Sequence, residues 1–242
     1  MSARTAIVTG GGKRVGARIV QALIEDGWTV VAHVHHDDDS VPDGAIKVVA
    51  DLCDAHCSER IFAAADGLAP VRLLVNNAAR FAEDALSSLS GEEFDAHMHV
   101  NVFAPAKLIQ FFAERHGGAE DGLIVNLLDA KLAAPNADFL SYTLSKQALA
   151  GLTELAARAL AGRGIRVNGV APALMLRSGE QSGPNFDAMH ALNPLRRGVE
   201  PEDVVGAIRY LVDARCVTGQ VIVIDSGQRF LSLERDVQFL EG

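Results

Sequence analysis

The sequence has little cysteine, a deficit of positive charge and no long apolar run. Its 242 residues include three cysteines, and 22 Lys and Arg against 31 Asp and Glu give a net charge of −9. So few cysteines, odd in number, are typical of a reduced cytoplasmic protein. The acidic balance argues against nucleic acid or an anionic membrane as the main partner. We find no signal peptide and no membrane span, and expect a cytoplasmic protein.

Metal ligands are also sparse. Cys53 and Cys57 are four residues apart, but no second pair accompanies them, so we expect two buried or half-buried thiols. His33 and His35 alternate along an expected strand without a carboxylate or cysteine clearly opposite. The sequence therefore predicts no metal site.

What the chain does have is a regular alternation of short apolar runs with helical patterns. Near-continuous apolar strands indicate burial on both faces, which means a parallel sheet covered by helices on either side. With no repeat, linker or break in composition, we predict one α/β domain over residues 1–242, with a doubly wound parallel sheet of about seven strands. The expected strands are Thr5–Val8, Thr29–Val34, Ala45–Val49, Val71–Val75, Leu123–Leu127, Ile165–Val170 and Val221–Ile224.

A glycine-rich segment follows the first strand. Residues 9–16 read Thr-Gly-Gly-Gly-Lys-Arg-Val-Gly, and apolar residues at helical spacing begin at Val15. A strand, a glycine-rich turn and a free helix N-terminus form a phosphate site, because backbone N–H groups and the helix dipole point to one spot. A simple tight turn is the alternative, and the strand–turn–helix context disfavours it.

Tyr142 and Lys146 are four residues apart in the segment Ser-Tyr-Thr-Leu-Ser-Lys. This spacing places both side chains on one helical face, one turn apart. A nearby ammonium favours the phenolate, so we expect Lys146 to lower the pKa of Tyr142 toward the range of a usable acid. Such pairs also occur by chance on helix surfaces, so the inference depends on the other motifs.

Further polar residues follow the expected strands. Asp51 follows the third strand and Asn76-Asn77-Ala78-Ala79 the fourth, where a cofactor's adenine and ribose would pass; helix caps or turns are the alternative. Asn101 lies in an expected helix, and Pro105 leaves its carbonyl without the usual N–H partner. We expect a kink there and a carbonyl free to bind water.

Two segments near the C-terminus are expected to shape the substrate site. The stretch Ser178–Pro194, part of a substrate loop over about 173–194, is the longest expected mobile loop and lies at the C-terminal side of the sheet. The tail of about 229–242 has no assigned role.

Together these motifs resemble the short-chain dehydrogenase/reductase family, whose fold is the Rossmann fold. The resemblance covers nearly the whole chain and includes the closing Thr218-Gly219 and Asp225-Ser226-Gly227. It implies that Tyr142 is the proton donor, that Lys146 holds the nicotinamide ribose and lowers the tyrosine's pKa, and that the Asn101 carbonyl anchors a water leading to the lysine.

Two departures narrow the resemblance. Arg14 replaces the middle glycine of the family's turn, and Asp129 replaces its catalytic serine. An ionised aspartate only accepts hydrogen bonds, so it suits a nitrogen-rich ring with N–H donors better than a plain ketone. With both departures the chain resembles the pteridine reductase branch of the family. This resemblance implies that Arg14 contacts cofactor phosphate and pterin and that Phe81 stacks the pterin against the nicotinamide. Ala79 stands where that branch usually has serine.

The end of the second strand favours NADPH as cofactor. An NAD site needs an acidic residue there, but this chain has Val34, and Lys13, Arg14, His33, His35 and His36 can surround a 2′-phosphate. The run Asp37–Asp39 is interpreted as a solvated turn. The expected cofactor set is Gly10, Lys13, Arg14, Val15, His33, His35, His36, Asp51, Leu52, Asn77, Ala78, Ala79, Tyr142, Lys146 and Pro172.

The sequence therefore predicts an NADPH-dependent reductase acting on a small molecule, a pteridine of the dihydropterin or dihydrofolate type. Its expected substrate-binding residues are Arg14, Phe81, Asp129 and Tyr142, and Asp129, Tyr142, Lys146 and Asn101 are the expected catalytic residues. The alternatives are a reductase of another carbonyl or imine, and a protein that senses NADP(H) without turnover. The resemblance also implies a homotetramer, with the helices Phe94–Glu114 and Thr143–Arg163 as candidate interfaces.

Overall fold

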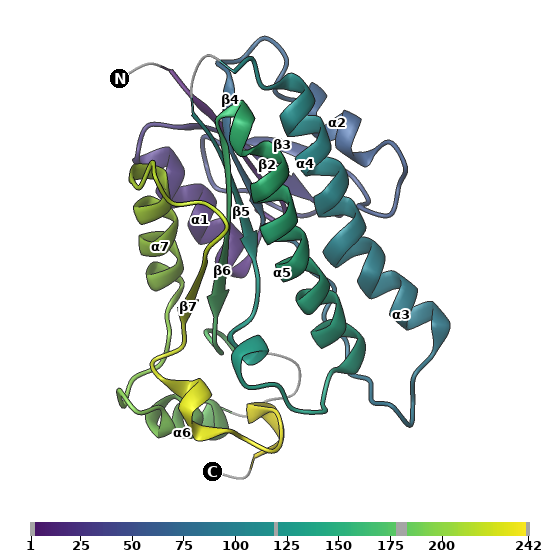
Figure 1. Cartoon of the computed structure of the whole chain (residues 1–242), viewed down its shortest axis with the longest axis vertical. Helices are drawn as coiled ribbons and strands as arrows, with labels where there is room; N and C mark the ends of the chain where they lie inside the picture. Colours follow the sequence, from purple (N-terminus) through teal and green to yellow (C-terminus); the bar gives the residue numbers. More distant parts are fainter. Residues whose placement is uncertain (1–2, 119–120, 178–182, 241–242) are drawn as a thin grey trace.

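The computed structural model describes residues 3–118, 121–177 and 183–240. One parallel sheet runs through it in the strand order β3-β2-β1-β4-β5-β6-β7 (Figure 1). The first six strands follow the classic Rossmann order, which confirms the doubly wound fold predicted from the apolar runs. The strands are β1 Thr5–Val8, β2 Thr29–Val34, β3 Ile46–Val49, β4 Val71–Asn76, β5 Gly122–Leu127, β6 Ile165–Pro172 and β7 Val221–Ile224.

Helices cover both faces of the sheet, as the two-sided burial of the strands requires. One core packs α1 and α7 against alternate strand residues such as Ala6 and Val8, and the other packs α2, α4 and α5 against Ile7 and Ile124. The helices are α1 Arg14–Glu25, α2 Cys57–Ala63, α3 Gly91–Met98, α4 Ala104–Arg115, α5 Leu140–Leu160, α6 Gly183–Leu192 and α7 Pro201–Asp213. Period-two alternation therefore sends neighbouring strand residues into different cores.

Two expected segments differ in the structure. The expected helix Phe94–Glu114 is α3, a π-helical turn η1 (His99–Phe103) and α4, so the predicted distortion near Pro105 is confirmed as a widened turn. Part of the expected loop Ser178–Pro194 is the helix α6, and residues 178–182 lie outside the described residues. The second expected interface helix is α5 with a short 3-10 extension, η3 (Ala161–Arg163).

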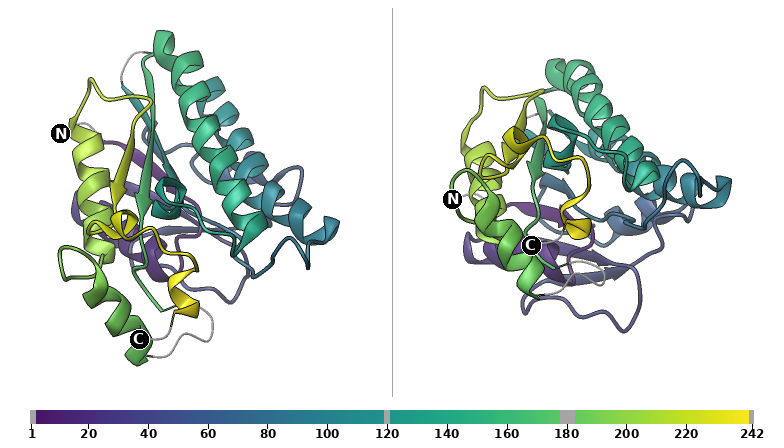
Figure 2. Two further views of the ribbon diagram at one scale, coloured as in Figure 1. Left: turned by 60° about the horizontal axis from the view of Figure 1, so that its bottom comes forward. Right: turned by 90° about the horizontal axis from the view of Figure 1, so that it is seen from below.

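The carboxyl ends of the strands face α6 and the last segment of the chain. Seen from below, the tail crosses this end of the sheet beside α6 (Figure 2). Three 3-10 turns belong to the same end: η2 Ala130–Ala133, η4 Gln228–Leu231 and η5 Val237–Phe239. In an open α/β sheet this edge binds ligands, where the strand order reverses between β1 and β4.

Candidate active site

The turn between β1 and α1 is bound to the loop after β4 by hydrogen bonds between side chains and backbone groups. Thr9 Oγ1 accepts hydrogen bonds from the N–H groups of Asn77 and Ala78, each at 3.0 Å, and the Asn77 amide donates to the carbonyls of Thr9 and Gly10 at 2.9 and 3.1 Å. A Cβ on Gly16 would lie 1.9 Å from the Gly10 carbonyl oxygen, so only glycine fits there. Glycine therefore allows the β1–α1 turn, the loop after β4 and the N-terminus of α1 to lie close together.

Arg14 has the backbone geometry of the glycine it replaces. Its φ is +53°, in the left-handed region that favours glycine. Its guanidinium donates to the carbonyls of Leu176 and Arg177 at 3.3 and 2.9 Å. Arg14 therefore has a strained backbone conformation, and its side chain links the glycine-rich turn to the segment after β6.

A cavity of about 460 Å³ begins at this turn and follows the ends of β1, β2 and β4. Its size is within the ~300–1,000 Å³ usual for ligand sites. Every residue of the predicted cofactor set except His36 lines it, and His36 instead packs its ring on His35, with 4.0 Å between centroids. Sequence reasoning did not anticipate several lining residues that carry no motif: Asp39, Val100, Leu127, Leu128, Ala173 and Met175.

His33 has a different role from the one predicted. Its side chain is buried, its Nδ1 accepts from the Gly10 N–H at 3.3 Å, and its Nε2 donates to the Ala50 carbonyl at 2.9 Å. Burial lowers the pKa of His33, so the ring is neutral. The expectation that His33 supplies charge to a 2′-phosphate is therefore wrong; it supports the glycine-rich turn.

Two further basic side chains of this cavity, Lys13 and His35, are exposed, and each lies near a carboxylate. Lys13 Nζ lies 3.9 Å from an Asp39 carboxylate oxygen, and His35 Nε2 lies 3.8 Å from Asp51 Oδ1. Asp51 also accepts from the Cys53 N–H at 2.8 Å.

Cys53 is exposed rather than buried or half-buried, and Cys57 is buried. Among the described residues, no group of three or more His, Cys, Asp and Glu could hold a metal ion.

Tyr142, Asp129 and Lys146 meet where β5 ends and α5 begins. Tyr142 Oη donates to Asp129 Oδ2 at 2.8 Å, while Asp129 Oδ1 accepts from the Lys131 N–H, also at 2.8 Å. Lys146 Nζ donates to the Leu127 carbonyl at 2.7 Å and lies 5.7 Å from the centre of the Tyr142 ring. The predicted catalytic residues Tyr142, Lys146 and Asp129 are thus brought together.

The electrostatics of this group correct one expectation. Burial, followed by the neighbouring Asp129, raises the pKa of Tyr142 well above its usual value, whereas Lys146 was expected to lower it. Burial also raises the pKa of Asp129 and lowers that of Lys146 to about 8. The ammonium of Lys146 is directed at a backbone carbonyl, so burial and the carboxylate at 2.8 Å together raise the pKa of the phenol. Tyr142 is consequently held in its protonated form.

Asn101 lies in the π-helical turn and connects three elements. Its side-chain amide donates to the Arg80 carbonyl at 3.0 Å and to Ser145 Oγ at 2.8 Å, and its oxygen accepts from the Arg80 N–H at 2.8 Å. The side chain therefore positions the loop that carries Phe81. Pro105 has no N–H to offer the Asn101 carbonyl, and the anchored water stays a prediction.

Phe81 lines a second, smaller cavity of about 220 Å³ together with Asp129, Tyr142 and Arg14. Its ring is 42% exposed, stacks on Phe139 with 4.5 Å between centroids, and meets the Tyr142 ring edge-on at 4.7 Å. An ordinary core aromatic would be covered, so this exposure favours a ring that receives a ligand.

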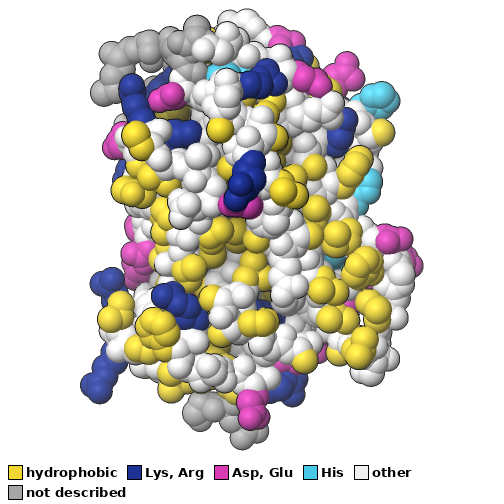
Figure 3. All heavy atoms as spheres, viewed as in Figure 1, with side chains coloured by type: hydrophobic (Ala, Val, Ile, Leu, Met, Phe, Trp, Pro, Cys, Tyr) yellow, Lys and Arg dark blue, Asp and Glu magenta, His cyan; other side chains and the backbone are white. Residues whose placement is uncertain are grey.

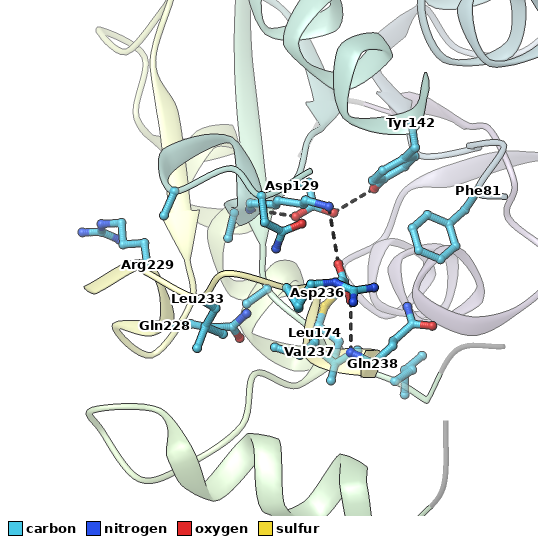
Figure 4. A pocket seen from close by; sticks show the side chains of 18 of the residues that line it. Phe81, Asp129, Tyr142, Leu174, Gln228, Arg229, Leu233, Asp236, Val237 and Gln238 are labelled. Atoms are coloured by element: carbon cyan, nitrogen blue, oxygen red, sulfur yellow. Dashed lines mark hydrogen bonds and ion pairs between the residues drawn. The ribbon is translucent and has the colours of Figure 1, made fainter. Parts of the chain in front are cut away.

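The opposite wall of this cavity comes from the C-terminal tail. Figure 4 shows Asp129 and Tyr142 on one side and Leu233, Asp236, Val237 and Gln238 on the other, with Phe81 beside them. The sequence did not predict these residues. Their partners in the fold, such as Asp138, are about a hundred positions away along the chain, and no motif marks them.

Comparison with known proteins agrees with this geometry. Residues 12–229 match the family model described as enoyl-(acyl carrier protein) reductase. Pteridine reductase 1 of Leishmania tarentolae is 31% identical over 93% of this chain and 96% of its own length, and L-xylulose reductase of Bos taurus is 33% identical over 94% and 97%. The crystal structure of FolM alternative dihydrofolate reductase 1 from Brucella suis, in complex with NADP, superposes with a TM-score of 0.86 at 34% identity, covering 93% of this chain and 95% of that one.

These matches, the sheet order and the Tyr142–Lys146 geometry define the class of protein: an oxidoreductase with a Rossmann fold. The chain belongs to the short-chain dehydrogenase/reductase family.

Proposed function

We propose that this enzyme uses NADPH to reduce a pteridine of the dihydropterin or dihydrofolate type, in a single domain that binds both cofactor and substrate. The observation that carries the proposal is the hydrogen bond of 2.8 Å from Tyr142 to Asp129, at the junction of the larger cavity with the pocket beside Phe81. Similarity to pteridine reductase 1 and to FolM supports the substrate class.

The larger cavity fits a dinucleotide. Gly12 lines the cavity and has no room for a side chain, because a Cβ there would lie 2.5 Å from the Ser40 carbonyl oxygen; glycine thus lets the turn pack against its neighbours and present its backbone to the cavity. The N-terminus of α1 and the Arg14 guanidinium supply positive charge for phosphates. We propose that Lys13, Arg14 and His35 face the 2′-phosphate and that Lys146 binds the nicotinamide ribose. The NADP of the similar Brucella suis structure supports this choice of cofactor.

Reduction of a C=N bond needs a hydride at carbon and one proton at nitrogen. Bound NADPH supplies the hydride. Tyr142 holds a proton next to the place of the ring nitrogen, because burial raises its pKa well above the usual value; burial also raises the pKa of Asp129, which accepts the tyrosine's hydrogen bond. Tyr142 delivers the proton, and the Lys146 ammonium nearby stabilises the negative charge that remains on the pair. Phe81 orients the flat ring by stacking.

The test is a panel of NADPH-oxidation assays with dihydropterins, dihydrofolate and simple ketones, for the wild type and Asp129→Ser. Because serine restores the family's usual donor, we expect pteridine reduction to fall by about tenfold to a hundredfold while ketone reduction holds or rises. Faster reduction of ketones than of any pteridine by the wild type would favour a carbonyl reductase instead. Cofactor binding without turnover of any substrate would indicate an NADP(H) sensor.

We also propose a homotetramer. Apolar side chains gather on the face shown in Figure 3. Two separate sets are exposed: Phe103, Leu144 and Leu155 on η1 and α5, and Tyr210 and Val221 on α7 and β7. Two different two-fold interfaces would produce a closed tetramer. Light scattering that gives the mass of one chain would contradict this.

No helix in the described part of the chain is long and apolar enough to cross a membrane. The three cysteines are free thiols, which supports our proposal of a reducing, cytoplasmic location. Fractionation of cells that express the protein tests it.

A further inference from the structure

Residues Leu233–Leu240, here called the C-terminal strap, fold back over the substrate cavity of their own chain. Five of them line the cavity opposite Asp129 and Tyr142: Leu233, Arg235, Asp236, Val237 and Gln238 (Figure 4). This segment adds no strand to the sheet and only one short turn, η5, to the secondary structure. Its place is therefore determined by side-chain contacts.

Two ion pairs fix the strap to the segment between β5 and α5. The Asp138 carboxylate accepts from Arg235 Nε at 2.9 and 3.0 Å and from the Asp236 N–H at 2.7 Å. In return, Lys131 Nζ lies 3.6 Å from Asp236 Oδ2, with side chains only 10% and 15% exposed. Such burial shields the Lys131–Asp236 pair from the solvent screening that weakens exposed ion pairs.

Aromatic stacking adds a third point of attachment. The Phe239 ring stacks on Phe139 with 5.7 Å between centroids, and Phe139 in turn stacks on Phe81 at 4.5 Å. Because Phe139 immediately precedes α5, the strap packs against the start of the helix that carries Tyr142. Phe139 therefore links the strap to Phe81, the ring on which we expect the substrate to stack.

The space between the strap and Tyr142 is small and partly open. The cavity of about 220 Å³ is below the ~300–1,000 Å³ of sites for drug-sized ligands. It has room for a two-ring system with a short substituent. A long substituent would have to pass where Val237 and Gln238 lie.

We propose that the strap limits substrate length: it admits dihydropterins with a short side chain and excludes the aryl-glutamate of folates. This inference rests on the proposed pteridine reductase function. The strap residues that line the cavity determine specificity, whereas Asp138, Phe139 and Phe239 act through the strap and are positioning residues.

The experiment loosens the strap without changing the cavity lining. In the double variant Asp138→Asn/Phe239→Ala, neither altered side chain is among the described residues that line the cavity. We expect the ratio of kcat/KM for dihydrobiopterin to that for dihydrofolate to fall at least tenfold relative to the wild type. Arg209→Ala is the matched control, because it removes an arginine–aspartate pair with Asp26 (2.8 Å) on the surface formed by α1 and α7; its ratio should match the wild type.

An unchanged ratio, or a parallel loss of both activities, would overturn the role of the strap and leave the pteridine reductase assignment standing. Should the double variant fail to fold, calorimetry on the NADP⁺-bound wild type decides, with pterins whose C6 substituents increase in length. Affinity that falls with length supports the inference, and affinity independent of length overturns it. Binding of no pteridine at all would overturn both this inference and the proposed function.

Discussion

The turn Thr9–Gly16 offers mainly its own backbone groups to the side chains that hold it, whereas the strap Leu233–Leu240 offers mainly side chains. In the turn, the carbonyls of Thr9 and Gly10 and the N–H of Gly10 have defined partners. In the strap, most of the attachment comes from Arg235, Asp236 and Phe239. The cofactor side therefore depends on residues, such as glycine, that allow a particular backbone conformation. The substrate side depends on pairs of side chains, which a substitution of either partner can alter. One active site thus combines a cofactor turn that depends on backbone conformation with a substrate wall that depends on side-chain pairs.

Tyr142, where the two regions meet, should show the largest effect. Tyr142→Phe removes the hydroxyl that donates to Asp129 and the only proton we place for transfer, so kcat should fall by roughly a hundredfold or more. NADPH affinity, measured by fluorescence titration, should stay near the wild-type value. A rate close to normal would mean that another group is the acid.

Arg14, which lines both cavities, tests the phosphate end of the cofactor site. On our proposal that Arg14 faces the 2′-phosphate, Arg14→Ala removes a charged contact of about 1.5–3 kcal/mol, so NADPH should bind about tenfold to a hundredfold more weakly, with a smaller loss for NADH. Equal losses for both cofactors would assign Arg14 to the shared pyrophosphate or to the substrate.

Arg14→Gly is the matched variant for this test. It loses the same charge but relieves the left-handed φ of +53°, a strain of about 1–2 kcal/mol for an ordinary residue. Its Tm should therefore exceed that of Arg14→Ala by a few degrees, at a similar NADPH affinity.

Lys146 should produce a smaller, pH-dependent effect. Burial lowers its pKa to about 8, so the ammonium is present below that pH and is lost as the pH rises through it. With Lys146 essential as a cation, kcat/KM should decline by about tenfold per pH unit above pH 8. Lys146→Arg keeps its charge throughout this range, so its profile, at a lower overall rate, should lack that decline. A wild-type profile that stays flat to pH 9.5 would argue that the charge on Lys146 is not needed.

The strands and the glycine-rich turn could be predicted because local patterns determine them. Runs such as Thr29–Val34 are mostly apolar, and their observed bounds lie within two residues of the predicted ones. The distortion near Asn101 was predictable because Pro105 lacks an N–H group. Local chemistry is sufficient in such cases.

Features that depend on distant partners could not be predicted in this way. His33 was interpreted as a phosphate contact because a sequence does not show that Gly10 and Ala50 enclose its ring. The pKa of Tyr142 was predicted in the wrong direction because the spacing to Lys146 was visible and the 2.8 Å contact with Asp129 was not. The strap was missed for the same reason: its pairing of Arg235 with Asp138 joins segments that no periodicity relates.

The strand order has a consequence for how the chain folds. β1 is an interior strand of the sheet, where Thr5 pairs with Thr29 on one side and Val71 on the other. The central pairing therefore closes a loop of more than sixty residues, and non-local parallel pairing of this kind slows folding. During synthesis, the apolar strand β1 must wait for β4 to leave the ribosome. In that interval its open edge is exposed to aggregation, so the yield of active enzyme should depend on translation speed and chaperones as well as on final stability.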